Sequence, residues 1–116
     1  KAIALEAKPL LPKGPIEGAV LLRLHFIMPR PKADFRRDGS CKRSDQYHIK
    51  KPDLDNLAKA VMDEMTGLGF WGDDRQVASL HVSKINARRQ GEAGVMIFVK
   101  SMSGDMEEMK EETKKE

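Results

Sequence analysis

The chain is poor in the residues on which disulfide-stapled, zinc-binding or membrane-embedded domains depend. One cysteine in 116 residues cannot form an internal disulfide, and no Cys/His set has the spacing of zinc ligands. No apolar run is long enough to span a bilayer, and no signal-peptide pattern opens the chain. We therefore expect a cytoplasmic protein with no membrane partner and no small-molecule cofactor.

Charge is what the chain has in plenty, at 34% of residues. The tail from residue 103 holds three lysines against six acids, a net −3, so that residues 1–102 carry +6 of a chain total of +3. A chain of this length forms a single domain with a modest core. A basic body with an acidic tail indicates a polyanionic partner, with nucleic acid as the first candidate.

Apolar patterns predict a small α/β (α+β) domain with helices packed on a mixed sheet. Residues 19–28 and 76–85 alternate as strands, and residues 95–99 form a third strand that we expect to pair with the second as a hairpin. Residues 1–8 read as a short helix. Between the first two strands lies an amphipathic helix.

That helix has recognisable start and stop signals. Pro52 suits a helix entrance, and Asp53 is a preferred capping residue. Gly67 and Gly69 are expected to stop the helix. Its apolar residues recur at spacings of three and four, namely Leu54, Leu57, Val61, Met65 and Leu68.

Two pairs of carboxylates flank this helix. Asp53 and Asp55 stand at its start, and Asp73 and Asp74 follow it at a turn. Carboxylates that converge repel one another unless a cation neutralises them, and oxygen ligands are those that Mg²⁺ prefers. Such a site activates water and neutralises a phosphodiester, while Lys59, on the same face as Asp55, would support transition-state charge.

A simpler interpretation remains open for these residues. Asp53 would cap the helix, Asp55 would pair with Lys59 on the surface, and Asp73 and Asp74 would form a solvated turn.

Residues 30–51 are expected to form a flexible loop that holds most of the body's positive charge. The segment has eight basic residues against three acids, a net +5, with aromatic side chains interleaved. It is either a phosphate-binding arm or a mobile, solvated loop. The candidate DNA-binding residues are Arg30, Lys32, Arg36, Arg37, Lys42, Arg43, Lys50 and Lys51.

The run Lys-Pro-Asp-Leu-Asp-Asn-Leu-Ala-Lys at 51–59, with Gly-Phe-Trp-Gly-Asp-Asp-Arg-Gln-Val at 69–77 and a later Lys84, resembles the RusA family of Holliday-junction resolvases. The resemblance implies a RusA-like, homodimeric nuclease domain over residues 1–102, of a kind often encoded by prophages. The charged tail, residues 103–116, is not part of that pattern.

The same resemblance implies an activity and a site. The protein would be a Mg²⁺-dependent endonuclease, with Mn²⁺ as a substitute, that cuts paired strands of a four-way DNA junction in recombination and repair. Asp53, Asp55 and Asp74 would bind the metal, and Lys59 would assist catalysis. Asp73 is secondary, and we expect Asn56 to support a ligating carboxylate.

Two other functions remain open. A non-catalytic module that holds branched DNA would bind through the basic loop without cutting. A phosphohydrolase of small nucleotides would not need the basic loop.

Overall fold

The computed structural model describes residues 14–102, so the expectations for residues 1–8 and for the tail lie outside the described residues. Its central strand is β1 (Val20–Met28). The alternate residues Val20, Leu22, Leu24 and Phe26 are 0–3% exposed, as strict alternation predicts for one face of a strand that covers a core. The strand expected at residues 19–28 is thereby confirmed.

The sheet has three strands in the order β2-β1-β3. β2 (Val77–Asn86) runs parallel to β1, and β3 (Gly94–Ser101) runs antiparallel to it. The predicted hairpin between the second and third strands is therefore wrong, although both strands exist. β1 is the most apolar strand and takes the central position, and the connection 87–93 is long enough to cross the sheet, whereas a hairpin loop has about two to five residues.

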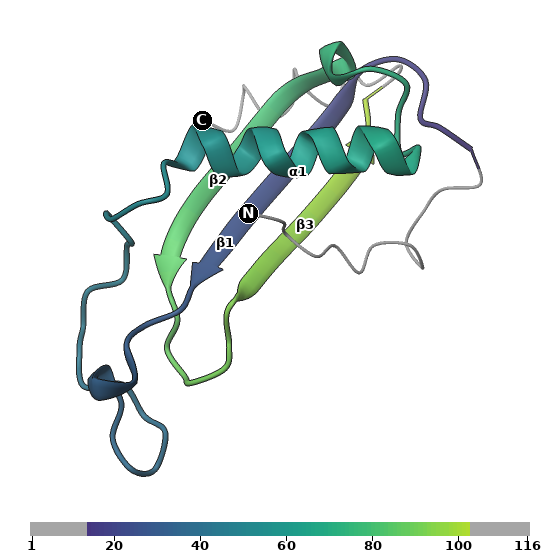
Figure 1. Cartoon of the computed structure of the whole chain (residues 1–116). Helices are drawn as coiled ribbons and strands as arrows, with labels where there is room; N and C mark the ends of the chain where they lie inside the picture. The colour runs from purple at the N-terminus through teal and green to yellow at the C-terminus, as the bar shows by residue number, and fades with distance from the viewer. Residues whose placement is uncertain (1–13, 103–116) are drawn as a thin grey trace, which may run out of the picture.

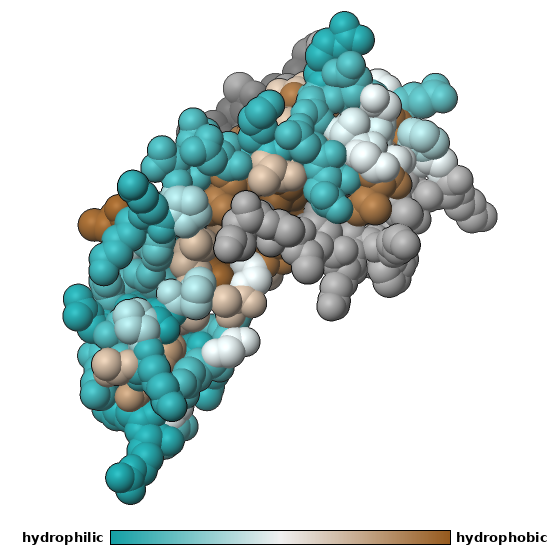
Figure 2. Space-filling model, viewed as in Figure 1, coloured by the Kyte–Doolittle hydropathy of each residue, from teal (hydrophilic) through white to brown (hydrophobic). Residues whose placement is uncertain are grey.

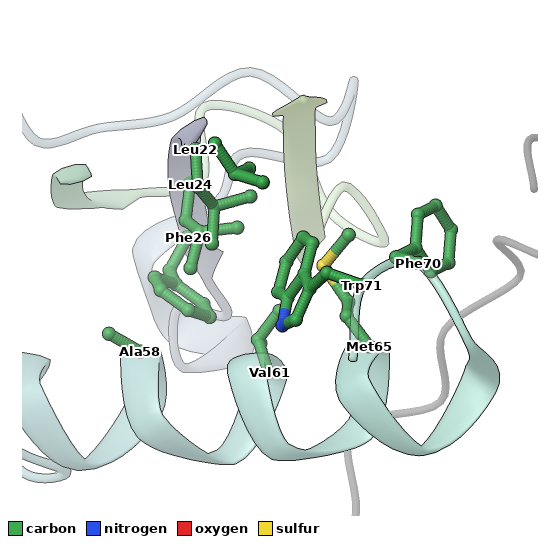
Figure 3. Packing of buried hydrophobic residues seen from close by; sticks show 9 residues of the cluster. Leu22, Leu24, Phe26, Ala58, Val61, Met65, Phe70 and Trp71 are labelled. Atoms are coloured by element: carbon green, nitrogen blue, oxygen red, sulfur yellow. The ribbon is translucent and has the colours of Figure 1, made fainter. Parts of the chain in front are cut away.

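Helix α1 (Leu54–Leu68) lies across one face of this sheet (Figure 1). Ala58, Val61 and Met65 face the buried side chains of β1, with Trp71 between them (Figure 3). Truncation of Met65 to alanine would cost about 2–5 kcal/mol of stability. Because one face of α1 is buried against the sheet in this way, only its opposite face is open to a ligand.

Gly69 ends this helix. Its φ of 92° is in the left-handed region, and its N–H reaches the carbonyls of Met65 and Thr66. Gly67, which we also expected to stop the helix, lies inside its last turn, because the helix ends only where φ becomes positive. Phe70 and Trp71 then close the turn as buried side chains.

The basic loop extends beyond the end of the sheet (Figure 1) and has more order than we expected. A short 3₁₀ helix, η2 (Lys32–Asp34), begins it, and isolated bridges join Phe35 to Cys41, Ser40 to Arg89 and Tyr47 to Ile85. The loop is thus fastened to β2 and to the connection that follows it.

The predicted fold class, a small α+β domain with a mixed sheet, is confirmed. Within residues 14–102 a single α-helix covers the sheet. No helix in that range has the length and apolar character that crossing a membrane requires.

Candidate active site

The first pair of carboxylates lies at the start of α1, and both side chains are exposed. Asp53 occupies the N-cap position but makes no side-chain capping bond, so its expected role as a cap is only positional. The carboxylate of Asp55 accepts a hydrogen bond of 2.9 Å from the backbone N–H of Asn56. Because this contact uses the backbone of Asn56, the support predicted from its side chain is absent from the described contacts. Both carboxylates are available to a ligand.

The other carboxylate site is built around Asp74, at the start of the 3₁₀ helix η3 (Asp74–Gln76). The Thr66 hydroxyl donates a hydrogen bond to Asp74 Oδ1, and Thr66 Oγ1 in turn accepts a 2.7 Å hydrogen bond from Trp71 Nε1. Trp71 is 1% exposed, and a buried indole N–H needs a partner. The hydrophobic core therefore positions Thr66, and Thr66 positions Asp74.

These contacts hold the pKa of Asp74 below its ordinary value. The hydrogen bond from Thr66 is the main cause, and partial burial opposes it. A hydrogen bond with the Asp63 side chain, the Trp71 indole and the charge of Lys59 lower this pKa further. Asp74 is thus kept ionised, and a second carboxyl, Asp63, stands next to it.

The two carboxylate sites lie at opposite ends of α1. Asp55 and Thr66 are eleven residues apart, which is about 16 Å along a helix axis. Within residues 14–102 no three His, Cys, Asp or Glu side chains come close enough to hold a metal ion. The donors are oxygens and fit Mg²⁺ in kind, but the three predicted ligands Asp53, Asp55 and Asp74 are not gathered within one chain.

Lys59 lies on the exposed side of α1 between these ends. Its charge makes only a minor contribution to the lowered pKa of Asp74, and it forms no ion pair with Asp55 in the described part of the chain. Asp73 has a local role, since its side chain accepts a 2.8 Å bond from Arg75 N and completes a capping box with Gln76. Asp73 therefore organises the turn that carries Asp74.

Seven of the eight candidate DNA-binding cations are exposed, and Arg30 is the exception. The Arg30 side chain is 5% exposed and forms an ion pair with Asp45 at 2.9 Å. Its Nε donates a 2.6 Å hydrogen bond to the Ala87 carbonyl. Arg30 fastens the loop to the sheet instead of facing solvent. The end of the molecule that the basic loop forms is mainly hydrophilic (Figure 2). The exposed cations of the loop are Lys32, Arg36, Arg37, Lys42, Arg43, Lys50 and Lys51.

Comparison with known protein families identifies the family of this chain. The family described as "Endodeoxyribonuclease RusA" matches residues 1–100. The chain belongs to the RusA family. The predicted resemblance is confirmed, and the family name is that of an endodeoxyribonuclease.

Three curated RusA relatives illustrate how far the similarity extends. A crossover junction endodeoxyribonuclease of Lactococcus phage r1t is 44% identical over 39% of this chain and 34% of its own length. The crossover junction endodeoxyribonucleases of Escherichia coli K12 and of Enterobacteria phage 82 are each 45% identical over 36% of this chain and 35% of theirs. The match thus spans about a third of the length of these relatives. No solved structure matches the chain.

Three residues of this RusA chain contribute contacts that the sequence reasoning missed. Thr66 and Asp63 adjoin Asp74. Both lie in the last two turns of α1, which could have placed them near the turn that follows the helix. Lys84 Nζ donates 2.6 Å bonds to the carbonyls of Lys50 and Pro52, and thereby fixes the segment that leads into Asp53.

Proposed function

We propose that this chain is a Mg²⁺-dependent endodeoxyribonuclease that resolves Holliday junctions by paired, symmetric nicks. The observation that carries the proposal is the match to the endodeoxyribonuclease family over residues 1–100, combined with carboxylates and a lysine along the exposed side of α1. Because the curated relatives are matched over about a third of their length, activity, substrate and partners are all part of the proposal. As an enzyme that acts on DNA, it would work in the cytoplasm.

The residues proposed to hold Mg²⁺ are Asp53, Asp55 and Asp74, with Mn²⁺ as a substitute. The bound ion would supply charge neutralisation at the phosphodiester and a more acidic water. Asp74 is supported in this role by its lowered pKa, since a ligand must be ionised. Lys59, whose charge reaches Asp74, would stabilise the negative charge that grows on the phosphate during attack. Asp73 would keep Asp74 in place.

A homodimer would complete the site. With about 16 Å between Asp55 and Thr66 along the helix, one chain does not bring Asp55 to Asp74. A two-fold axis places the start of one α1 near the end of the other when the helices pack antiparallel, and it generates two equivalent sites. Two such sites match the two-fold symmetry of a four-way junction, as paired nicks require.

The exposed cations of the basic loop would hold the arms of the junction. Their charge supplies the sequence-independent, salt-sensitive part of DNA binding. Arg30 is not included among these contacts, because its guanidinium is buried against Asp45 and the Ala87 carbonyl. It acts on DNA only through the shape that it gives the loop.

The experiment that tests this function compares a synthetic four-way junction with a linear duplex of the same sequence. Each is incubated with the chain in Mg²⁺, in Mn²⁺ and in EDTA. Paired nicks in the junction alone, lost in EDTA, are the expected result. Cleavage of both substrates at the same rate would refute junction selectivity, and light scattering that shows a strict monomer would refute the dimer.

One observation favours a second candidate, a non-catalytic module that binds branched DNA. The described part of a single chain gathers no three carboxylates. This module would bind the junction with the same salt dependence and leave it intact in Mg²⁺. The cleavage experiment therefore separates the two functions directly.

A further inference from the structure

A cavity of about 550 Å³ lies where the basic loop packs against the end of β2 and the connection to β3. Four arginines and one aspartate contribute to its wall, which gives these residues a net charge of +3. They are Arg30, Arg43, Arg88, Arg89 and Asp45. The cavity is thus separate from the carboxylates of α1 and opposite to them in charge.

The single acid of this wall is already neutralised. Asp45 pairs with Arg30 at 2.9 Å and stands 3.8 Å from Arg43, and the hydrogen bond from Arg30 lowers its pKa. An incoming anion therefore meets the remaining arginines without competing against a free carboxylate.

Arg88 and Arg89 supply the uncompensated charge. The nearby acid, Glu92, is held by the backbone, since its Oε1 accepts from Arg88 N at 2.7 Å and Arg89 N at 3.2 Å. Among the ion pairs of residues 14–102, neither guanidinium has a partner, and both residues are exposed. Two adjacent free guanidinium groups suit phosphate oxygens, which they bind in bidentate fashion.

We propose that this cavity binds the phosphodiester backbone of a DNA arm, through Arg88 and Arg89 together with Arg43. The inference rests on the proposed function and adds a contact to it. The connection after β2 joins the loop in this role, because Arg89 bridges to Ser40 through the backbone.

The cavity is also connected through the backbone to the start of α1, where Asp53 and Asp55 lie. Asn86 N donates a 2.8 Å hydrogen bond to the Gln46 carbonyl, and His48 N donates a 3.0 Å hydrogen bond to the Lys84 carbonyl. Residues 46–48 therefore lie alongside the end of β2. Asp45 and Asp53 are eight residues apart, at most about 29 Å of chain. A duplex rises about 3.4 Å per base pair, so the backbones of Asp45 and Asp53 are no further apart than about nine base pairs of DNA.

The test measures binding of a fluorescent four-way junction by the full chain in EDTA, across a series of NaCl concentrations. The variant Arg88→Gln/Arg89→Gln should lower the slope of log K against log salt by about 2, and should weaken binding about thirtyfold at 0.15 M salt. Glutamine removes the charge but leaves the backbone contacts of the connection unchanged. The matched control Arg23→Gln removes a cation that stacks on Phe98 on the face of the sheet away from α1, and should leave the slope unchanged.

Binding is measured without metal, so its outcome is independent of cleavage. An unchanged slope in the double variant, with normal cutting of the junction in Mg²⁺, would overturn the cavity proposal and leave the nuclease function intact. An equal loss of slope in Arg23→Gln would also overturn it, because the effect would then be general. The variant Arg88→Lys/Arg89→Lys keeps the charge and should restore the slope, which excludes loss of folding as the cause.

Discussion

The two ends of α1 hold their carboxylates in different ways. At the start of the helix, Asp53 and Asp55 are exposed and are held only through the backbone of their own segment. At the end of the helix, Asp74 receives the hydroxyl of Thr66, which is itself anchored by the buried Trp71. One end is open and the other is preorganised.

This difference indicates how a site can be shared between two copies of a chain. A preorganised carboxylate loses little freedom when it takes a ligand, because the core has already fixed it. The open carboxylates can adjust to the phosphate and to the partner chain. The comparison therefore predicts that Asp74 has structural as well as catalytic effects, and that Asp55 has catalytic effects alone.

The largest expected effect is the loss of cutting in Asp55→Asn and in Asp74→Asn. Each should slow junction cleavage by roughly a thousandfold, since each removes a carboxylate proposed to hold the Mg²⁺ ion that neutralises the reacting phosphate. Junction binding in EDTA should persist or tighten, because a negative charge near phosphate is removed. Cleavage and binding of the labelled junction are measured side by side. Cutting at the normal rate by either variant would contradict the site.

Mixing these two inactive variants sharpens the comparison. If Asp55 of one chain acts with Asp74 of its partner, a mixed dimer has one intact site, and an equal mixture should recover roughly a quarter of the intact sites of a symmetric dimer. If both residues act within one chain, every mixed dimer has two damaged sites and the mixture stays inactive. The control is each variant mixed with itself.

A smaller loss is expected when Lys59 is removed from the middle of the helix. Lys59→Ala should lower the cleavage rate about a hundredfold through lost stabilisation of transition-state charge, with little change in junction affinity. Lys51→Ala is the matched control, since it removes an exposed cation next to the helix start and should weaken binding with little change in the rate at saturation. Equal losses of rate and affinity in Lys59→Ala would make that residue a docking group.

The Thr66→Val variant removes only the contacts that hold Asp74 at the end of α1. It keeps the shape of Thr66 but removes the hydroxyl, so Trp71 Nε1 loses its partner and Asp74 loses its strongest contact. We expect a roughly ten- to hundredfold slower reaction, as for loss of a residue that orients a ligand, and a cost of about 1–3 kcal/mol in unfolding free energy. Cleavage kinetics and denaturant unfolding measure these. Thr66→Ser should retain both properties, and equal behaviour of the two variants would contradict the role of the hydroxyl.

The elements of the fold were predictable, because each one has a local pattern. Alternation marked β1, and the stripe that includes Val61 and Met65 marked α1, since those side chains must bury against each other. The strand order was not predictable from local pattern. It depends on which strand takes the centre, and the length of the connection 87–93 permits a crossing past the end of β1 without requiring one.

The sequence points to candidate residues for the site but not to their arrangement. The family resemblance gave Asp53, Asp55 and Asp74 as candidate ligands, yet convergence within one chain assumed that the turn folds back to the helix start. The turn instead stays at the helix end, because Phe70 and Trp71 are buried directly after Gly69. Sequence spacing gives the distance along a chain, whereas the packing of the core decides where a turn points.

The smallest expected effect is on the pH dependence of stability, and it again separates the two ends of α1. Asp74 has a lowered pKa in the folded chain, so its contribution to stability is present above the unfolded-state pKa of about 3.9 and is lost as pH falls through the folded-state value. Thr66→Val removes the main cause of that lowering. The difference in Tm between wild type and this variant should therefore shrink as pH falls from roughly 6 toward roughly 2.5. It should not vanish, because the lost bond from Trp71 Nε1 does not depend on pH. Thermal unfolding followed by circular dichroism at several pH values provides the measurement, with Thr66→Ser expected to follow wild type. A Tm difference that is constant across this range would show that the Thr66 hydroxyl stabilises the turn through Trp71 alone, and that Asp74 is no more preorganised than Asp55.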